Sequence, residues 1–128
     1  MLSNDHVFSN KKNIHCHPGW LPLERGSTTI YYSLLNQRDI SITSFFMTRR
    51  IDDGKMILRK SFPSPTKKVD IDIYVDPAVR SLVLLQTLKL LQENEPIDII
   101  EDTETKEVEY YVIHPILKHL AIDLIGSK

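Results

Sequence analysis

The sequence predicts a mixed α/β fold, in which short strands alternate with helices. Runs rich in β-branched and aromatic residues are typical of strands, and a leucine-rich run has apolar residues at helical spacing. Clusters of proline and glycine separate these runs. The chain has 128 residues, of which 41% are hydrophobic and 26% charged, so we expect a single globular domain over residues 1–128.

The first predicted elements surround a loop that is rich in turn-forming residues. Asn13 to His17 is a short run that predicts a strand. Residues 18–26 contain two prolines and two glycines, which excludes a helix or the interior of a strand. Residues 27–35 predict a helix, for which Ser27 or Thr28 is the expected N-cap.

The next two elements are predicted strands joined by a turn. Residues 39–47 alternate in part and are rich in β-forming side chains, so they predict a strand. Residues 49–54 contain the turn sequence Asp-Asp-Gly. Residues 55–62 predict a second strand, which the prolines that follow should end.

The second half of the chain begins with a clear helix signal. Asp76 is a preferred N-cap and Pro77 suits the first helical position, so a helix should run from there to about Glu93. Its predicted core stripe consists of Val79, Leu82, Val83, Gln86 and Leu90. The remaining predicted elements are strands at 97–101 and 107–114, a turn between them at 102–106, and a last helix at 116–124.

Composition argues against several classes of function. The net charge is −1, from 16 Lys and Arg against 17 Asp and Glu, so no nucleic-acid partner is indicated. The single cysteine, Cys16, excludes an internal disulfide and favours a reducing compartment. No signal-like segment and no run near the roughly 20 apolar residues of a membrane span occur. We therefore expect a cytoplasmic protein without a membrane partner.

His15 and His17 are the first candidates for chemistry. Residues two apart in a strand share a face, so both imidazoles should point the same way where the strand ends. Together they could bind a divalent metal, with a third ligand from Asp52, His114 or His119. Alternatively, one histidine could be structural, or a histidine with a pKa near neutrality could exchange protons or stabilise an oxyanion.

Three further residues near this pair are candidates. Asp52 lies at the tip of the strand–turn–strand and could orient a histidine as the acid of a triad does, or could be an ordinary turn residue. Arg25 could bind a carboxylate or a phosphate through its planar guanidinium, or could tie the loop to an acidic side chain. Trp20 is expected to anchor the loop or to form the wall of a pocket.

Three segments resemble the 10-formyltetrahydrofolate-dependent formyltransferases. Residues 15–26 (HCHPGWLPLERG) are similar to the signature Asn-x-His-Pro-Ser/Gly-x-Leu-Pro-x-x-Arg-Gly of that family. Residues 41–43 stand where the family often has Gly-Val-Thr, and residues 51–57 resemble its Ile/Leu-Asp-Thr-Gly segment. The order and spacing of the three agree. The resemblance is nearest to the sugar-amine N-formyltransferases and extends to the methionyl-tRNA formyltransferases.

The resemblance implies roles for individual residues. His17 corresponds to the histidine that polarises the formyl group and assists proton transfer, and Asp52 to the acid that orients it. His15 stands at the position of the family's asparagine and is a possible oxyanion donor. The co-substrate 10-formyltetrahydrofolate would contact Asp52, Ile51 and Gly54. The amine substrate would contact Arg25, Gly19 and Trp20. The resemblance implies no metal.

The resemblance covers only part of the family's domain. In that family a stretch of alternating strands and helices precedes the signature, whereas only residues 1–12 precede it here. We therefore expect the carboxyl-terminal part of a Rossmann-like formyltransferase domain, with a catalytic-motif core at 13–58 and a small α+β extension at 59–128. The exposed edge of its sheet would be covered by a homodimer or by the missing amino-terminal half on another chain.

The predicted function is transfer of a formyl group from 10-formyltetrahydrofolate to a primary amine, with an amino sugar or sugar nucleotide as the expected acceptor. Two alternatives stay open. One is a catalytically inactive truncated remnant or assembly module. The other is a metal-dependent hydrolase that uses His15 and His17.

Overall fold

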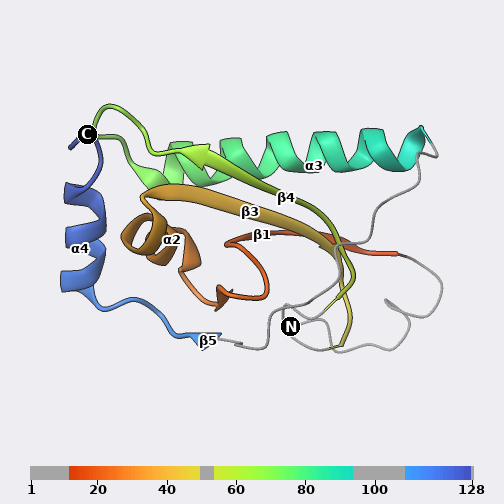
Figure 1. Ribbon diagram of the computed structural model, residues 1–128, viewed down its shortest axis with the longest axis horizontal. Coiled ribbons are helices and arrows are strands. Elements are labelled where there is room, and N and C mark those ends of the chain that lie inside the picture. The colour runs from red at the N-terminus through yellow and green to blue at the C-terminus, as the bar shows by residue number, and fades with distance from the viewer. Residues whose placement is uncertain (1–11, 50–53, 94–108, 128) are drawn as a thin grey trace.

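A three-stranded antiparallel sheet forms the centre of the computed structural model, which describes residues 12–49, 54–93 and 109–127. The strands are β1 (Ile14–Pro18), β3 (Asp39–Phe46) and β4 (Met56–Pro63), in the order β1-β3-β4. All three were predicted from the sequence to within a residue. The mixed α/β class is confirmed (Figure 1).

The two faces of β3 have different neighbours. Ile40 and Ile42 belong to the larger apolar core, together with Val83 of helix α3 (Asp76–Gln92). Phe45, which points to the opposite face because side chains alternate along a strand, packs with Leu21 and Met56 in a smaller cluster. The second face is the one that carries the candidate site.

Helix α2 (Thr29–Gln37) connects β1 to β3 and begins two residues later than predicted. Thr28 occupies the N-cap position, but its side chain makes no capping hydrogen bond and its φ is +53°. Its hydroxyl instead donates to the carbonyl of Ser27 at 2.8 Å and accepts from the backbone N–H of Ile113 at 2.9 Å. Thr28 therefore connects the start of α2 to the carboxyl-terminal part of the chain.

Helix α3 (Asp76–Gln92) lies along the sheet and ends where predicted. It also begins at Asp76, within a residue of the prediction, but Asp76 does not have the predicted capping role, because a π-helical turn (Ile71–Val75) leads directly into the helix. Asp70 caps that turn by accepting a hydrogen bond from the backbone N–H of Ile73 at 3.0 Å. Asp76 is therefore not an N-cap, and its carboxylate pairs with Arg80 at 3.0 Å.

The predicted core stripe of α3 is only partly correct. Val79 and Val83 are buried, and so is Thr87, whose hydroxyl donates to Ser44 of β3 at 2.7 Å. Leu82, in contrast, is 50% exposed. Apolar residues surround this helix, so their spacing alone did not show which side would face the sheet.

The last elements differ from the predicted hairpin. The only strand described after α3 is β5 (Glu109–Tyr110), which pairs in parallel with β2 (Arg25–Gly26) of the loop. The predicted strand 107–114 was therefore too long. Its expected partner at 97–101 and the turn at 102–106 lie outside the described residues. Helix α4 (Pro115–Asp123) follows, packs on α2, and is capped by His114, which accepts from the backbone N–H of Ile116.

The expected division of the chain at residue 58 falls inside a strand. Strand β4 (Met56–Pro63) crosses that position without interruption, and α3 packs against the sheet that β4 belongs to. Helices α2 and α4 lie together at the end of the sheet where β3 begins (Figure 1). None of the helices that the structure describes is both long and apolar enough to cross a membrane.

Candidate active site

His15 and His17 share one face of β1, as the period of a strand requires. In the antiparallel register they lie opposite Phe45 and Thr43 of β3, respectively. The centroids of the two imidazole rings are 6.3 Å apart. The predicted juxtaposition of the two side chains is therefore present, but their surroundings differ.

His17 is buried, with 2% of its surface exposed. Its Nε2 donates a hydrogen bond to the carbonyl oxygen of Glu24 at 2.6 Å, and the hydroxyl oxygen of Thr29 lies 3.4 Å from the same nitrogen. A carbonyl can only accept, so the proton of a neutral His17 is on Nε2 and Nδ1 is the basic nitrogen. The loop thus determines both the orientation and the tautomer of this imidazole.

His15 is only partly buried. Its ring stands edge-on to Phe45, with centroids 5.5 Å apart. It also lines a cavity of about 210 Å³ between β1 and α3, together with Cys16, Arg80, Ser81 and Leu84. Helix α3 packs on the face of β1 that carries Cys16, whereas the His15 ring lies on the opposite face against Phe45, so this cavity is not a cavity at the imidazole. His15 is nevertheless the less buried of the two histidines.

Hydrogen bonds from two side chains, those of Glu24 and Thr43, hold the loop that follows β1 in place. The carboxylate of Glu24 accepts from the backbone N–H of Trp20 at 2.9 Å and from the hydroxyl of Ser33 at 3.0 Å. The hydroxyl of Thr43 donates to the carbonyl of Gly19 at 2.7 Å and accepts from the backbone N–H of Leu21 at 3.2 Å. These bonds attach both halves of the loop to α2 and β3.

Glu24 is an unusual residue in this network because it is ionisable and only 2% exposed. Burial raises the pKa of its carboxyl group, because a low-dielectric surrounding disfavours the anion. Hydrogen bonds from the Trp20 backbone and the Ser33 hydroxyl act in the opposite direction, as does the side chain of Asn36. The folded protein therefore holds the Glu24 proton more tightly than the unfolded chain does.

Glu24→Gln should change how the stability of the protein depends on pH. A carboxyl group with a raised folded pKa favours folding at low pH, and this advantage is lost as the pH rises from the unfolded value of about 4.3 through the folded one. Melting temperatures measured between pH 4 and pH 8 should fall less steeply for the variant than for the wild type. Glu93→Gln, at an exposed position, is the control. Parallel curves for Glu24→Gln and wild type would contradict this account.

Two glycines of the predicted site are required by close backbone approaches. A Cβ on Gly19 would lie 2.8 Å from the carbonyl oxygen of Glu24 and 3.0 Å from Nε2 of His17. A Cβ on Gly54 would lie 1.8 Å from the carbonyl oxygen of Phe46. The distances of 2.8 Å and 1.8 Å to the two carbonyl oxygens are too short for a side chain, so Gly19 and Gly54 have a structural reason to be glycine whatever they contact in a complex.

Gly26→Ala should separate β2 from β5. Gly26 has a φ of +105°, and an added Cβ would lie 2.1 Å from the carbonyl oxygen of Tyr110. We expect a loss of about 1–3 kcal/mol in unfolding free energy from backbone strain, together with faster amide exchange at Ser27, whose N–H donates to Tyr110 at 2.9 Å. Thermal melts and hydrogen exchange would measure both. Ser27→Ala, which leaves the backbone unchanged, should behave like the wild type.

The remaining predicted site residues are placed as follows. Asp52 and Ile51 lie outside the described residues, so their predicted roles stay predictions. Trp20 is half-buried, and the guanidinium of Arg59 lies 4.5 Å from the centroid of its ring. Arg25 is the first residue of β2, where it lies opposite Glu109.

The metal hypothesis gains no support from the described part of the chain. Within residues 12–49, 54–93 and 109–127, no three histidine, cysteine or acidic side chains form a group that could hold a metal ion. His114 caps α4, and His119 faces Asp123 of the same helix at 3.2 Å. Cys16 points away from the histidines into the core, where burial raises the pKa of its thiol.

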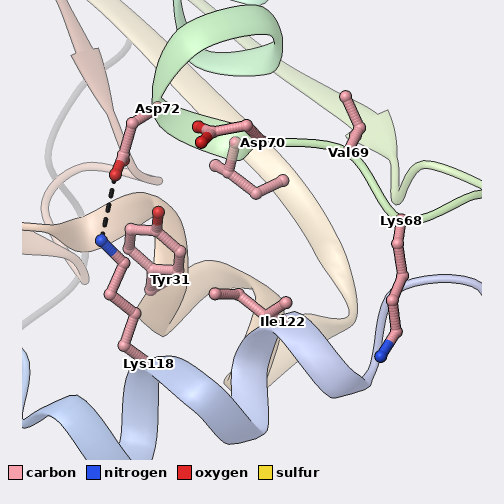
Figure 2. A pocket seen from close by; sticks show the side chains of 8 residues that line it. Tyr31, Lys68, Val69, Asp70, Asp72, Lys118 and Ile122 are labelled. Atoms are coloured by element: carbon pink, nitrogen blue, oxygen red, sulfur yellow. Dashed lines mark hydrogen bonds and ion pairs between the residues drawn. The ribbon is translucent and has the colours of Figure 1, made fainter.

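A second hollow, of about 480 Å³, lies between α2, the π-helical turn and α4 (Figure 2). Lys118 pairs with Asp72 at 3.0 Å and lies 4.7 Å from the centroid of the Tyr31 ring. Burial, aided by Asp72, raises the pKa of Tyr31 to about 12. Lys68, at the rim, pairs with Asp123 at 3.3 Å. Because these charges pair with one another, the hollow indicates no particular ligand.

Sequence reasoning missed the residues that hold the loop. Glu24, Thr29 and Thr43 are buried polar residues, and each contacts the backbone or a side chain of the loop. Thr43 could have been recognised, because it lies on a predicted strand two residues before the buried Phe45. Nothing in the local pattern around Glu24 indicates that its carboxylate is buried.

Comparison with known proteins gives a sequence relative but no family model that matches. The chain is similar to the methionyl-tRNA formyltransferase of Desulforamulus reducens, with 32% identity over 85 residues. The match covers 63% of this chain and 26% of the relative, so the chain spans about a quarter of that relative's length.

The fold is similar to solved formyltransferase structures. A 4-N formyltransferase from Francisella tularensis matches with a TM-score of 0.66 and 17% identity, over 95% of this chain and 55% of that enzyme. A sugar 3N-formyltransferase, solved in the presence of dTDP and 5-N-formyl-THF, matches with a TM-score of 0.58 and 20% identity, over 77% and 36%. Sequence and fold together confirm the resemblance to formyltransferases and show that the chain corresponds to part of such an enzyme.

Proposed function

We propose that this chain, a relative of the formyltransferases, supplies catalytic residues of a site that transfers a formyl group from 10-formyltetrahydrofolate to a primary amine. The observation that carries this proposal is the pair of histidines at the end of β1, held by the signature loop. The similarity in sequence and fold to formyltransferases supports it independently.

In the proposed reaction the amine nitrogen attacks the formyl carbon, and the carbonyl oxygen becomes an oxyanion. The bond between that carbon and N10 of the folate then breaks, the amine loses a proton, and N10 gains one. His15, which is only partly buried, would donate an N–H to the oxyanion. His17 would assist the proton transfer, with Asp52 as the acid that orients it.

The imidazole of His17 is buried and held in one orientation. This suits a residue that must be accurately positioned for proton transfer. Its Nε2 proton is directed to the Glu24 carbonyl, so Nδ1 is the nitrogen that would exchange a proton in the proposed reaction. The buried loop keeps this ring from rotating. A preorganised imidazole of this kind loses little entropy when the reaction occurs.

An amino sugar is the acceptor that we favour over a charged tRNA. Two of the solved neighbours are, by name, a 4-N formyltransferase and a sugar 3N-formyltransferase. The curated relative acts on methionyl-tRNA by name, but this chain has a net charge of −1 and no excess of basic residues for binding a polyanion. A cytoplasmic location would provide both folate and sugar nucleotide.

The test is release of tetrahydrofolate from 10-formyltetrahydrofolate in the presence of an amino-sugar nucleotide. The purified 128-residue chain is assayed with and without the amine. Release that depends on the amine supports the proposal. A folded chain that releases no tetrahydrofolate, with amino-sugar nucleotides or with methionyl-tRNA, would favour the inactive remnant. Stoichiometric bound Zn²⁺ with amine-independent hydrolysis would favour the hydrolase.

A further inference from the structure

Glu24 is a buried acid at a position of the loop where the signature that the loop resembles requires no particular residue. Only 2% of its surface is exposed. Among the residues that the structure describes, its carboxyl oxygen Oε1 has no hydrogen-bond partner. A buried carboxyl group with one unpaired oxygen costs folding free energy. Departures of this kind are typical of functional sites, so Glu24 needs an explanation other than stability.

The carboxyl group of Glu24 fixes the backbone of its own residue. Its Oε2 accepts from the backbone N–H of Trp20 at 2.9 Å and from the hydroxyl of Ser33 at 3.0 Å. The backbone N–H of Glu24 donates to the carbonyl of Trp20 at 3.0 Å. Residues 20 and 24 are thus joined twice, and Ser33 attaches the pair to α2. On the other side of Glu24, β2 pairs with β5, so the direction of the Glu24 carbonyl is restrained from both sides.

The Glu24 carbonyl accepts the Nε2 proton of His17 at 2.6 Å. Thr29 provides a second acceptor, because its hydroxyl donates to the carbonyl of Pro18 and so presents a lone pair to Nε2, 3.4 Å away. Gly19 leaves room for this arrangement, since a Cβ there would lie 2.8 Å from the Glu24 oxygen and 3.0 Å from Nε2. Two acceptors at Nε2 favour the tautomer that is protonated on this nitrogen.

We propose that Glu24 is a positioning residue for His17. Through Trp20 and Ser33 its carboxyl group fixes the loop, and its own backbone carbonyl then holds the Nε2 proton, so that Nδ1 is the nitrogen that exchanges a proton. Glu24 acts through His17 and does not touch the substrate. This inference rests on the proposed function, because it takes His17 to be the group that assists proton transfer.

The first test is nitrogen NMR of the histidine side chains in the intact 128-residue chain, without folate or amine. The chemical shifts of the two imidazole nitrogens show which of them carries the proton. At a pH where His17 is neutral, the wild type should be protonated at Nε2 alone. Glu24→Ala should give a mixture of the two tautomers. Glu24→Gln, whose amide oxygen can accept both bonds, should restore the wild-type shifts.

Val83→Ala is the control for a loss of stability without a change at the loop. Val83 is fully buried in the larger core, away from the loop. This variant should melt at a lower temperature and keep the wild-type shifts of His17. If Glu24→Ala shows no cooperative melt, Ser33→Ala, which removes only the contact with α2, should show the mixture instead. Wild-type shifts in the folded loop variant, or an equal mixture in Val83→Ala, would overturn the proposal.

Release of tetrahydrofolate then connects the tautomer to the reaction. The kcat of Glu24→Ala should fall about 10²-fold, the cost of a misplaced catalytic group, while its KM changes little. Glu24→Gln should retain most of the turnover. A mixed tautomer with undiminished kcat would refute the positioning role. A wild type that is protonated at Nε2 alone and yet releases no tetrahydrofolate would count against the proposed function and not against the role of Glu24 in holding His17.

Discussion

His17→Ala is expected to reduce formyl transfer by a factor of about 10²–10⁴, the usual contribution of a positioned acid or base. It should also lower stability, because the Glu24 carbonyl loses the Nε2 donor at 2.6 Å in a buried site. An unsatisfied buried acceptor costs about 1–3 kcal/mol. Tetrahydrofolate release and thermal melts, measured on the same preparation, would show both effects.

Substitutions of His15 should affect turnover more than stability, so they test the catalytic role separately from the packing of the side chain. His15 is only partly buried, so His15→Ala should cost less stability than His17→Ala while lowering turnover by about 10²–10³, as the loss of one oxyanion donor does. His15→Asn, which restores an N–H donor at this position, should recover most of the activity. Full turnover in His17→Ala would refute its catalytic role. Equal losses in His15→Ala and His15→Asn would refute the donor role of His15.

Phe45→Ala should be the most damaging change in the core beside the site. Phe45 is 2% exposed, packs with Leu21 and Met56, and meets the ring of His15 edge-on at 5.5 Å. Truncation of a buried phenylalanine costs about 3–5 kcal/mol in unfolding free energy. Chemical denaturation of the wild type and the variant would measure the difference.

Phe45→Leu is the informative companion to that change. It keeps much of the apolar volume between Leu21 and Met56 but removes the aromatic edge against His15. We expect a smaller loss of stability, together with a measurable shift in the chemical environment of the His15 ring by NMR. If Phe45→Leu and Phe45→Ala destabilise the protein equally, packing volume is not what makes Phe45 important.

Local patterns were sufficient for much of the fold. The strands β1, β3 and β4 were predicted because their β-forming runs end at proline or glycine, and these signals act within a few residues. The end of α3 and the position of α4 were also predicted from local signals, in particular the prolines near them. The resemblance to formyltransferases was also visible, since it lies in the order of side chains along residues 13–58.

Local patterns failed where the outcome depends on distant parts of the chain. Nothing near Glu109 indicates that it pairs with Arg25, and nothing near Glu24 indicates burial against Ser33. The leucines of α3 were assigned to the core because spacing identifies apolar residues but does not say which side meets the sheet.

The sequence by itself determined which chemical groups this protein carries and where its strands and helices run. It placed both histidines on one face of one strand. Only the tertiary structure decided that His17 is buried with its Nε2 on the Glu24 carbonyl and that the ring of His15 is partly exposed against Phe45. The physical reason is that burial and hydrogen bonding depend on contacts between segments far apart in the chain, which no local pattern encodes.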